Sequence, residues 1–431
     1  MDQNRPIVKS DLRRDLGLLD AVAVGLGAII GAGIFVVTGV AAGVAGPAFL
    51  VGLLIAGGVA TCNALSSAQL AATYPQSGGT YEYGYRVLHP WLGFVAGWMF
   101  LISKLAAGGT VALGFAGYLH ALIPAIPQRP AAVAIIILLT AINYIGIRKT
   151  GRLNIAIVSI SLATLVYFIV GGLPALDMGN LRPFAPHGWR RVLESTAMLF
   201  FAYTGYARLA TLGEEVSDPK RNIPRAIMIA LGIAILLYML VALVAVGGVG
   251  AEAMAATASP LERAAQAFPL PGVALVIAIG ATTAMLGVLL SQILGISRML
   301  FAMARRHDLP ALLSHVHPEY EVPDRGIILT GLAAIIVALF GTLETIVAAA
   351  SFSILIYYML ANLSALRMRP QDKLFPDWVP VLGAISCAAL ALTLRMPVIL
   401  GGLAMLAAGL VWRVVYRRVS GHTMAGEELE R

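Results

Sequence analysis

The stretch GLGAIIGAGIF, residues 25–35, decides the fold, because it sets four glycines inside an apolar run long enough to cross a membrane. A bilayer core of about 30 Å needs about 20 mostly apolar residues of helix, whereas each glycine costs a helix about 1 kcal/mol relative to alanine. Small residues let membrane helices approach one another closely, and the spacing from Gly27 to Gly31 fits that purpose. The alternative is a helix that is interrupted here.

Composition assigns the chain to the all-α polytopic membrane proteins. Of its 431 residues, 59% are hydrophobic and 12% are charged, and the mean hydropathy is +0.85. These values are too apolar for a soluble globular protein. A length of about 20 residues per helix divides the chain into about twelve membrane spans. The predicted spans are residues 18–44, 47–73, 88–119, 129–147, 153–173, 192–214, 225–248, 271–302, 326–342, 346–366, 377–394 and 397–416.

Basic residues indicate the orientation in the membrane. With the N-terminal segment 1–17 inside, 22 of the 30 lysines and arginines fall in cytoplasmic segments and 6 on the opposite side. The positive-inside rule then places both termini, including the tail 417–431, on the cytoplasmic side of the inner membrane. No cleavable signal precedes the first span. The net charge of +8 is dispersed over short loops, so we expect no nucleic-acid partner.

The sequence lacks motifs for catalysis and metal binding. Cys62 and Cys387 both lie in apolar runs and are expected to be buried, inert thiols. His315 and His317 have no further metal ligand at a suitable spacing. There is no P-loop, HExxH motif or nucleophile elbow. We therefore expect no enzymatic activity, no cofactor and no metal site.

A second predicted helix is also interrupted, at Thr204-Gly205 within FFAYTGYARLATLGEEV, residues 200–216. Inverted-repeat transporters bind their substrate where two broken helices meet, because the freed backbone groups need polar partners that lipid cannot supply. Helix N-termini attract a carboxylate, and free carbonyls at the ends of the preceding half-helices attract an ammonium group. A site of this kind fits an amino acid.

Several segments resemble the signature segments of the amino acid-polyamine-organocation transporter superfamily, namely GAIIGAGIF, PQSGGTYEYGY, FFAYTGYARLATLGEEVSDPKRNIPRAI and FAMARRHDLP. The resemblance implies the leucine-transporter fold, with five helices in residues 18–173, an inverted repeat of five in residues 192–366, and two further helices in residues 377–416. It also implies a secondary active transporter of amino acids, a symporter or an exchanger, that works by alternating access within the lipid membrane.

By motif position, the resemblance implies a substrate site at the two interruptions. The substrate carboxylate is expected at the backbone of Ala32, Gly33 and Ile34. The ammonium group is expected at the carbonyls of Ile29, Phe201, Ala202 and Thr204, and the side chain of Phe201 is expected to gate the site.

Two cytoplasmic motifs have simpler interpretations. The tyrosines of PQSGGTYEYGY, residues 75–85, fit interfacial anchors. The charged residues of GEEVSDPKRNIPR, residues 213–225, fit either solvated salt bridges or an inner gate, whose partners would be Arg298, Arg305 and Arg306.

Selectivity and ion coupling are less constrained by the sequence. Ala207 stands where many members of the superfamily have an acid, which favours a small or neutral amino acid. Ser161 stands about where some proton-coupled members have a lysine, so that particular proton device is missing. Ser291 is a hydroxyl candidate for a sodium site, and the choice between proton coupling, sodium coupling and exchange stays open. Lys104 and Arg208 lie inside predicted spans, where a charge costs about 2.5–3.5 kcal/mol. Lys104 either snorkels to an interface or takes the role of that lysine.

Two other functions stay open. A transporter of polyamines or other organic amines would need no site for a carboxylate. A sensor would bind an amino acid without moving it across the membrane.

Overall fold

The computed structural model describes residues 16–74, 78–146, 151–210 and 216–420, and this part of the chain contains helices and no strand. Helix covers most of each predicted span. The helices in the predicted first repeat are α1 (Leu18–Ile29), α2 (Thr38–Ala45), α3 (Phe49–Thr73), α4 (Thr80–Tyr83), α5 (Pro90–Leu122), α6 (Gln128–Tyr144) and α7 (Gly151–Gly172).

The predicted second repeat and the last two helices follow in the same way. They comprise α8 (Trp189–Tyr203), α9 (Ala207–Ala210), α10 (Pro219–Ala255), α11 (Pro260–Ala265), α12 (Val273–Arg305), α13 (Asp324–Phe340), α14 (Leu343–Leu366), α15 (Trp378–Thr393) and α16 (Met396–Val419). Among the described residues, seven helical stretches are long and apolar enough to cross a membrane, and α6 and α15 are shorter apolar helices.

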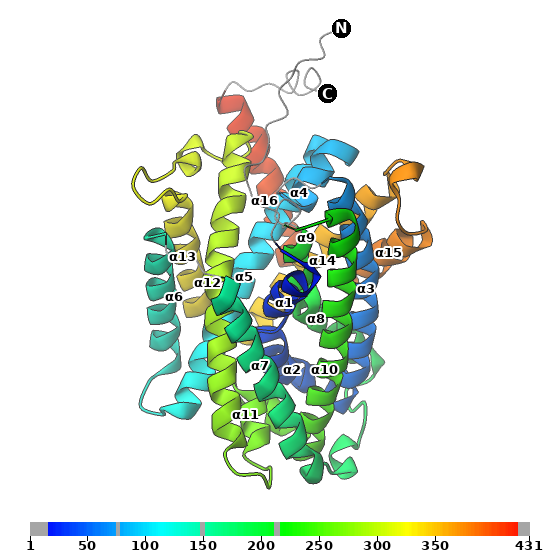
Figure 1. Cartoon of the computed structure of the whole chain (residues 1–431), viewed down its shortest axis with the longest axis vertical. Helices are drawn as coiled ribbons and strands as arrows, with labels where there is room; N and C mark the ends of the chain where they lie inside the picture. Colours follow the sequence, from blue (N-terminus) through cyan, green and yellow to red (C-terminus); the bar gives the residue numbers. More distant parts are fainter. Residues whose placement is uncertain (1–15, 75–77, 147–150, 211–215, 421–431) are drawn as a thin grey trace.

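The interrupted helices lie at the centre of the bundle. In Figure 1, α1 and α8 lie in the middle, α6 and α13 lie side by side at one edge, and α15 lies at the opposite edge. α1 packs against α7 and α10, while α8 packs against α2, α3 and α14. The two glycine-containing segments that the sequence singled out are therefore surrounded by other helices rather than by lipid.

The outer surface of the helix bundle carries apolar side chains, as the core does. Large hydrophobic side chains such as Ile336 on α13, Leu392 on α15 and Val411 on α16 are exposed. Soluble proteins rarely expose apolar surface on this scale, whereas a lipid environment favours it. The prediction of an all-α, multi-pass membrane protein is confirmed at this level.

The helix that begins at Pro219 is longer than its predicted span, residues 225–248. Proline is well tolerated in the first turn of a helix, so α10 begins at Pro219. At the other end, Gly250 adopts a φ of 80°, and helix continues beyond this kink to Ala255. Glycine tolerates a positive φ without the steric penalty of a side chain.

Candidate functional site

The first interruption lies within the quoted stretch. α1 ends at Ile29, and Ile30 is extended with φ −75° and ψ 107°. After Gly31 the chain re-enters helix through a π-helical turn, Gly33–Val37, that leads into α2. The Thr38 hydroxyl donates a hydrogen bond to the carbonyl oxygen of Ile34 (2.7 Å) within this turn. The predicted break is therefore confirmed, and it frees backbone groups from regular helical pairing.

The second interruption is tighter. α8 ends at Tyr203, and a 3₁₀ turn, Thr204–Tyr206, leads directly into α9. The backbone stays in the right-handed helical region throughout this turn, and the Thr204 hydroxyl donates to the carbonyl oxygen of Phe201 (2.9 Å). The break predicted at Thr204-Gly205 is confirmed as a change of helix type rather than as an extended segment.

The two interruptions contact each other through glycines. A β-carbon at Gly33 would lie 2.5 Å from the α-carbon of Ala202 on α8. A β-carbon at Gly205 would lie 2.1 Å from the carbonyl oxygen of Ala28 on α1. Both distances are shorter than side chains tolerate, so glycine is required at each position. The contact is reciprocal, because each interruption places a glycine against the backbone of the other helix.

The other glycines of the opening stretch also make close contacts with neighbouring helices. A β-carbon at Gly25, Gly27 or Gly31 would meet Leu209, Val158 or Val288, respectively. Close helix packing and helix interruption, the two interpretations of GLGAIIGAGIF, therefore hold together in one segment.

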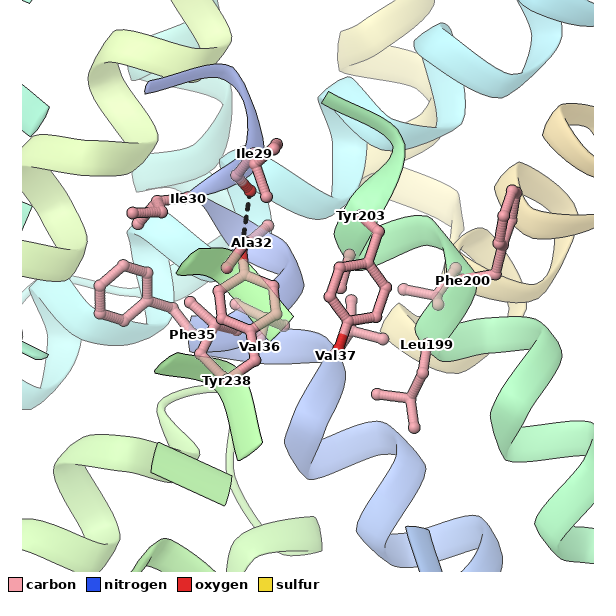
Figure 2. Close-up of a cluster of buried hydrophobic side chains, with 14 of the residues drawn as sticks. Ile29, Ile30, Ala32, Phe35, Val36, Val37, Leu199, Phe200, Tyr203 and Tyr238 are labelled. Atoms are coloured by element: carbon pink, nitrogen blue, oxygen red, sulfur yellow. Dashed lines mark hydrogen bonds between the residues drawn. The ribbon is translucent and has the colours of Figure 1, made fainter. Parts of the chain in front are cut away.

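Tyrosine hydroxyls from three other helices bind carbonyls near the interruptions. Tyr238 of α10 donates to the carbonyl oxygen of Ile29 (2.8 Å), as Figure 2 shows. Tyr358 of α14 donates to the carbonyl oxygen of Thr204 (3.2 Å). Tyr118 of α5 donates to the carbonyl oxygen of Phe35 (2.7 Å). Buried backbone groups need such partners, and the sequence alone had not identified these three residues.

The expected substrate residues lie together around this crossing. Ala32, Gly33 and Ile34 are buried at the start of the π-helical turn, and Ala202 is buried at the end of α8. The carbonyls of Ile29, Phe201 and Thr204 each accept a hydrogen bond from a side-chain hydroxyl, as described above. A carbonyl oxygen has two lone pairs, and the Phe201 oxygen already accepts from both the backbone N–H and the hydroxyl of Thr204.

Phe201 lies beside this crossing and is only partly buried. Its side chain packs against a small apolar cluster formed by Ala106 of α5 with Ile346 and Ala350 of α14. The neighbouring Phe200 is fully buried and contacts Tyr358 edge to face, with ring centroids 5.6 Å apart. Phe201 is therefore less enclosed than Phe200, as a movable side chain needs to be.

The three coupling candidates lie on three different helices. The Ser161 and Ser291 hydroxyls donate to carbonyls of their own helices, Ile157 and Gly287, both at 2.8 Å. The Lys104 ammonium lies 5.6 Å from the centre of the Phe100 ring, a cation–π distance. None of the described contacts joins these three side chains to one another.

Lys104 lies where α5 packs against α12. Gln292 of α12 donates to the backbone carbonyl of Lys104 (2.8 Å), so this part of α5 lies against α12. Arg208 lies close enough for its charge to repel that of Lys104. The two cations inside predicted spans therefore influence each other electrostatically, although they stand 104 positions apart in the chain.

Asn154 on α7 is a polar residue that the sequence interpretation missed. Its side-chain oxygen lies 3.1 Å from the point that a β-carbon on Gly27 would occupy. Its Nδ2 atom is buried without a hydrogen-bond partner among the described residues. An asparagine one turn before Val158, on the helix face that carries Ser161, was the available signal.

The described residues of the motif at residues 75–85 join a buried ionic network around Asp308. Tyr81 and Tyr85, expected as interfacial anchors, instead donate to Asp308, which is fully buried (2.8 and 2.5 Å). Burial and the Asp308 charge raise the pKa of Tyr81 above its ordinary value, so its hydroxyl stays protonated as a donor. Asp308 also pairs with Arg413 (3.3 Å) and Arg417 (3.2 Å) of α16.

Arg306, one of the expected inner-gate partners, pairs with Glu82 of α4 (2.6 Å). Of the acids in the motif at residues 213–225, Glu214 and Glu215 lie outside the described residues, and Asp218 is exposed. The other expected partners, Arg298 and Arg305, make no ion pair with an acid in the part of the chain that the structure describes.

A multi-pass helical protein with two interrupted helices that cross at its centre has the architecture of a membrane transporter. The chain matches the amino acid permease family over residues 20–421 and belongs to that family. It is 42% identical over 418 residues to an uncharacterized transporter of Mycobacterium tuberculosis, covering 95% of this chain and 94% of the relative.

Two further relatives have more specific names. A methylthioribose transporter of Bacillus subtilis is 33% identical over 408 residues, which are 87% of each chain. A branched-chain amino acid permease of the same species is 28% identical over 438 residues, covering 95% of this chain and 94% of the relative. The chain is therefore a transporter-family protein, and the relatives support the prediction that it is not an enzyme.

Proposed function

We propose that the protein is a secondary active transporter, a symporter or an exchanger, that carries amino acids across the cytoplasmic membrane by alternating access. The reciprocal contact between Gly33 and Ala202 and between Gly205 and Ala28 is the observation that supports this most directly. It brings the backbones of the two interruptions together, so that the amides proposed for the carboxylate and the carbonyls proposed for the ammonium group belong to one site.

In this proposal the substrate lies between the two interruptions. Its carboxylate binds the backbone amides of Ala32, Gly33 and Ile34, at the start of the second half-helix, where the helix dipole favours an anion. Its ammonium group binds the carbonyls of Ile29, Phe201, Ala202 and Thr204. Phe201 then closes over the bound amino acid.

The proposed architecture is the leucine-transporter fold, with repeats in residues 18–173 and 192–366 and two additional helices in residues 377–416. Both termini lie in the cytoplasm, which agrees with 22 of 30 basic residues falling on that side. Lys104 is the proposed coupling residue, because it is a cation inside a span that lies against α12.

Uptake by the purified protein in proteoliposomes tests the proposal. The panel contains neutral amino acids, their decarboxylated amines, a polyamine and methylthioribose, each with and without a sodium or pH gradient. We expect uptake of one or more amino acids and at least about tenfold weaker binding of the matching amines, equivalent to about 1.4 kcal/mol. Comparable affinity for the amines would favour an amine transporter, and binding without uptake would favour a sensor.

A further inference from the structure

A buried polar cluster joins the second interruption to α15, a helix outside the two proposed repeats. Its members are Asn63 of α3, Asn362 of α14 and Cys387 of α15, none of which is exposed. Asn362 donates through Nδ2 to the side-chain oxygen of Asn63 (2.6 Å), and Asn63 donates through Nδ2 to the sulfur of Cys387 (3.2 Å). Buried amides are costly unless they are hydrogen-bonded, so this cluster fixes the three helices at one relative depth.

The cluster reaches the substrate region through Tyr358. Asn362 also donates to the backbone carbonyl of Tyr358, one turn earlier on α14 (2.9 Å). The Tyr358 hydroxyl in turn donates to the carbonyl oxygen of Thr204 in the second interruption (3.2 Å). Two sets of hydrogen bonds, joined covalently through Tyr358, therefore connect Cys387 of α15 by way of α3 and α14 to the backbone of Thr204.

A glycine on α15, Gly383, allows this helix to pack closely against Asn362 of the cluster. A β-carbon at Gly383 would lie 2.6 Å from the side-chain oxygen of Asn362. Any larger residue at position 383 would therefore displace the Asn362 amide from α15. Glycine at this position and asparagine at position 362 are complementary across the helix contact.

We propose that Asn362 is a positioning residue for the substrate ammonium. It sets the depth of α14 so that the Tyr358 hydroxyl holds the Thr204 carbonyl in the orientation that the ammonium group requires. α15 thereby supports the substrate site, although it contributes no residue to it. The inference rests on the proposed function, in which the Thr204 carbonyl accepts the ammonium group.

The experiment compares Asn362→Leu, Tyr358→Phe and the double variant in reconstituted uptake of the best wild-type substrate. Each single variant is expected to raise the KM about tenfold. The double variant should match the single variants, because residues that act through one bond are not additive. Ser364→Ala is the matched control, since Ser364 is equally buried on α14 and donates only within its helix, to Leu360 (2.9 Å).

A second readout separates positioning from general damage. Competition by a des-amino analogue, which keeps the carboxylate and lacks the ammonium group, should be nearly unchanged in Asn362→Leu. Gly383→Ala should reproduce the rise in KM from the α15 side, and it tests the inference even where Asn362→Leu does not fold. Gly401→Ala is its control, because a β-carbon there meets nothing within 4 Å.

The outcomes distinguish the two proposals. If the wild-type protein takes up no amino acid, the proposed function fails. If the wild-type protein transports an amino acid while Tyr358→Phe and Gly383→Ala leave the KM unchanged, the positioning role of Asn362 is wrong. Additive effects in the double variant, or an equal loss of affinity for the des-amino analogue, would also overturn it.

Discussion

Replacing Gly205 by alanine is the most direct test of the close backbone contact between the two interrupted helices. The new β-carbon would lie 2.1 Å from the carbonyl oxygen of Ala28, 2.3 Å from its carbonyl carbon and 2.5 Å from the nitrogen of Ile29. Ordinary van der Waals contact begins at 3.4 Å, so the two backbones must separate by the difference, about 1.3 Å. Overpacking of this kind typically costs about 1–3 kcal/mol. We expect the upper part of that range, because backbone atoms cannot rotate away as side chains do.

Gly33→Ala provides a graded comparison. Its β-carbon would lie 2.5 Å from the α-carbon of Ala202, so the separation needed is smaller, about 0.9 Å. The control is Gly232→Ala on α10, where a β-carbon meets nothing within 4 Å. That substitution removes only the poor helix propensity of glycine and is expected to be neutral or to stabilise by up to about 1 kcal/mol.

The assay measures both stability and substrate affinity. Thermal unfolding of the purified variants in detergent should follow the order Gly232→Ala, Gly33→Ala, Gly205→Ala, from most to least stable. Binding of the transported amino acid should weaken in the same order, because separating the two backbones displaces the groups proposed to hold the substrate, and each 1.4 kcal/mol lost from binding is about tenfold in affinity. If Gly205→Ala unfolds and binds like the wild-type protein, the two helices do not cross as closely as the structure indicates.

The remaining predictions concern single side chains elsewhere in the protein. Phe201→Ala should reduce transport much more than expression or thermal stability, whereas proportionate losses of all three would indicate a packing role. Lys104→Met should abolish the pH dependence of transport while preserving the fold, and an unaltered pH profile in uptake assays would reject Lys104 as the coupling residue. Asp308→Asn should destabilise the protein by about 3–5 kcal/mol, because it leaves buried Arg413 without its carboxylate. Asp377→Asn, at an exposed ion pair with Lys373, should cost at most about 1 kcal/mol in the same unfolding assay.

The sequence was sufficient to predict where helices form and where two of them are interrupted. The length of each apolar run, the glycines of residues 25–35 and the Thr204-Gly205 pair are local features of the chain, and a single sequence displays local features directly. The form of the second break was not predictable in this way. Whether Thr204 begins an extended segment or a 3₁₀ turn depends on its contacts with α1 and α14.

The hydrogen-bond partners of the freed backbone groups could not be predicted from the sequence. Tyr238 lies 209 residues from Ile29, and Tyr358 lies 154 residues from Thr204. No periodicity in the chain indicates which tyrosine faces which carbonyl, because that depends on the rotation and depth of each helix in the bundle. The partner of Tyr81 could not be predicted from the sequence either. A tyrosine near a membrane surface fits an interfacial anchor, and only the structure shows that Tyr81 donates to the buried Asp308.

The glycines at the two interruptions explain how a broken helix can be stable inside a membrane protein. Each glycine weakens its own helix, and each break frees backbone groups that lipid could not satisfy. The same absence of a side chain lets the two backbones meet, at Gly33 against Ala202 and at Gly205 against Ala28. Hydroxyls on α10 and α14 then bind the carbonyls of Ile29 and Thr204. Because these partners belong to other helices, the interruptions are stable only while the helices are packed together. Any movement of one helix relative to another therefore changes the position and the hydrogen bonds of the carbonyls that are proposed to hold the substrate.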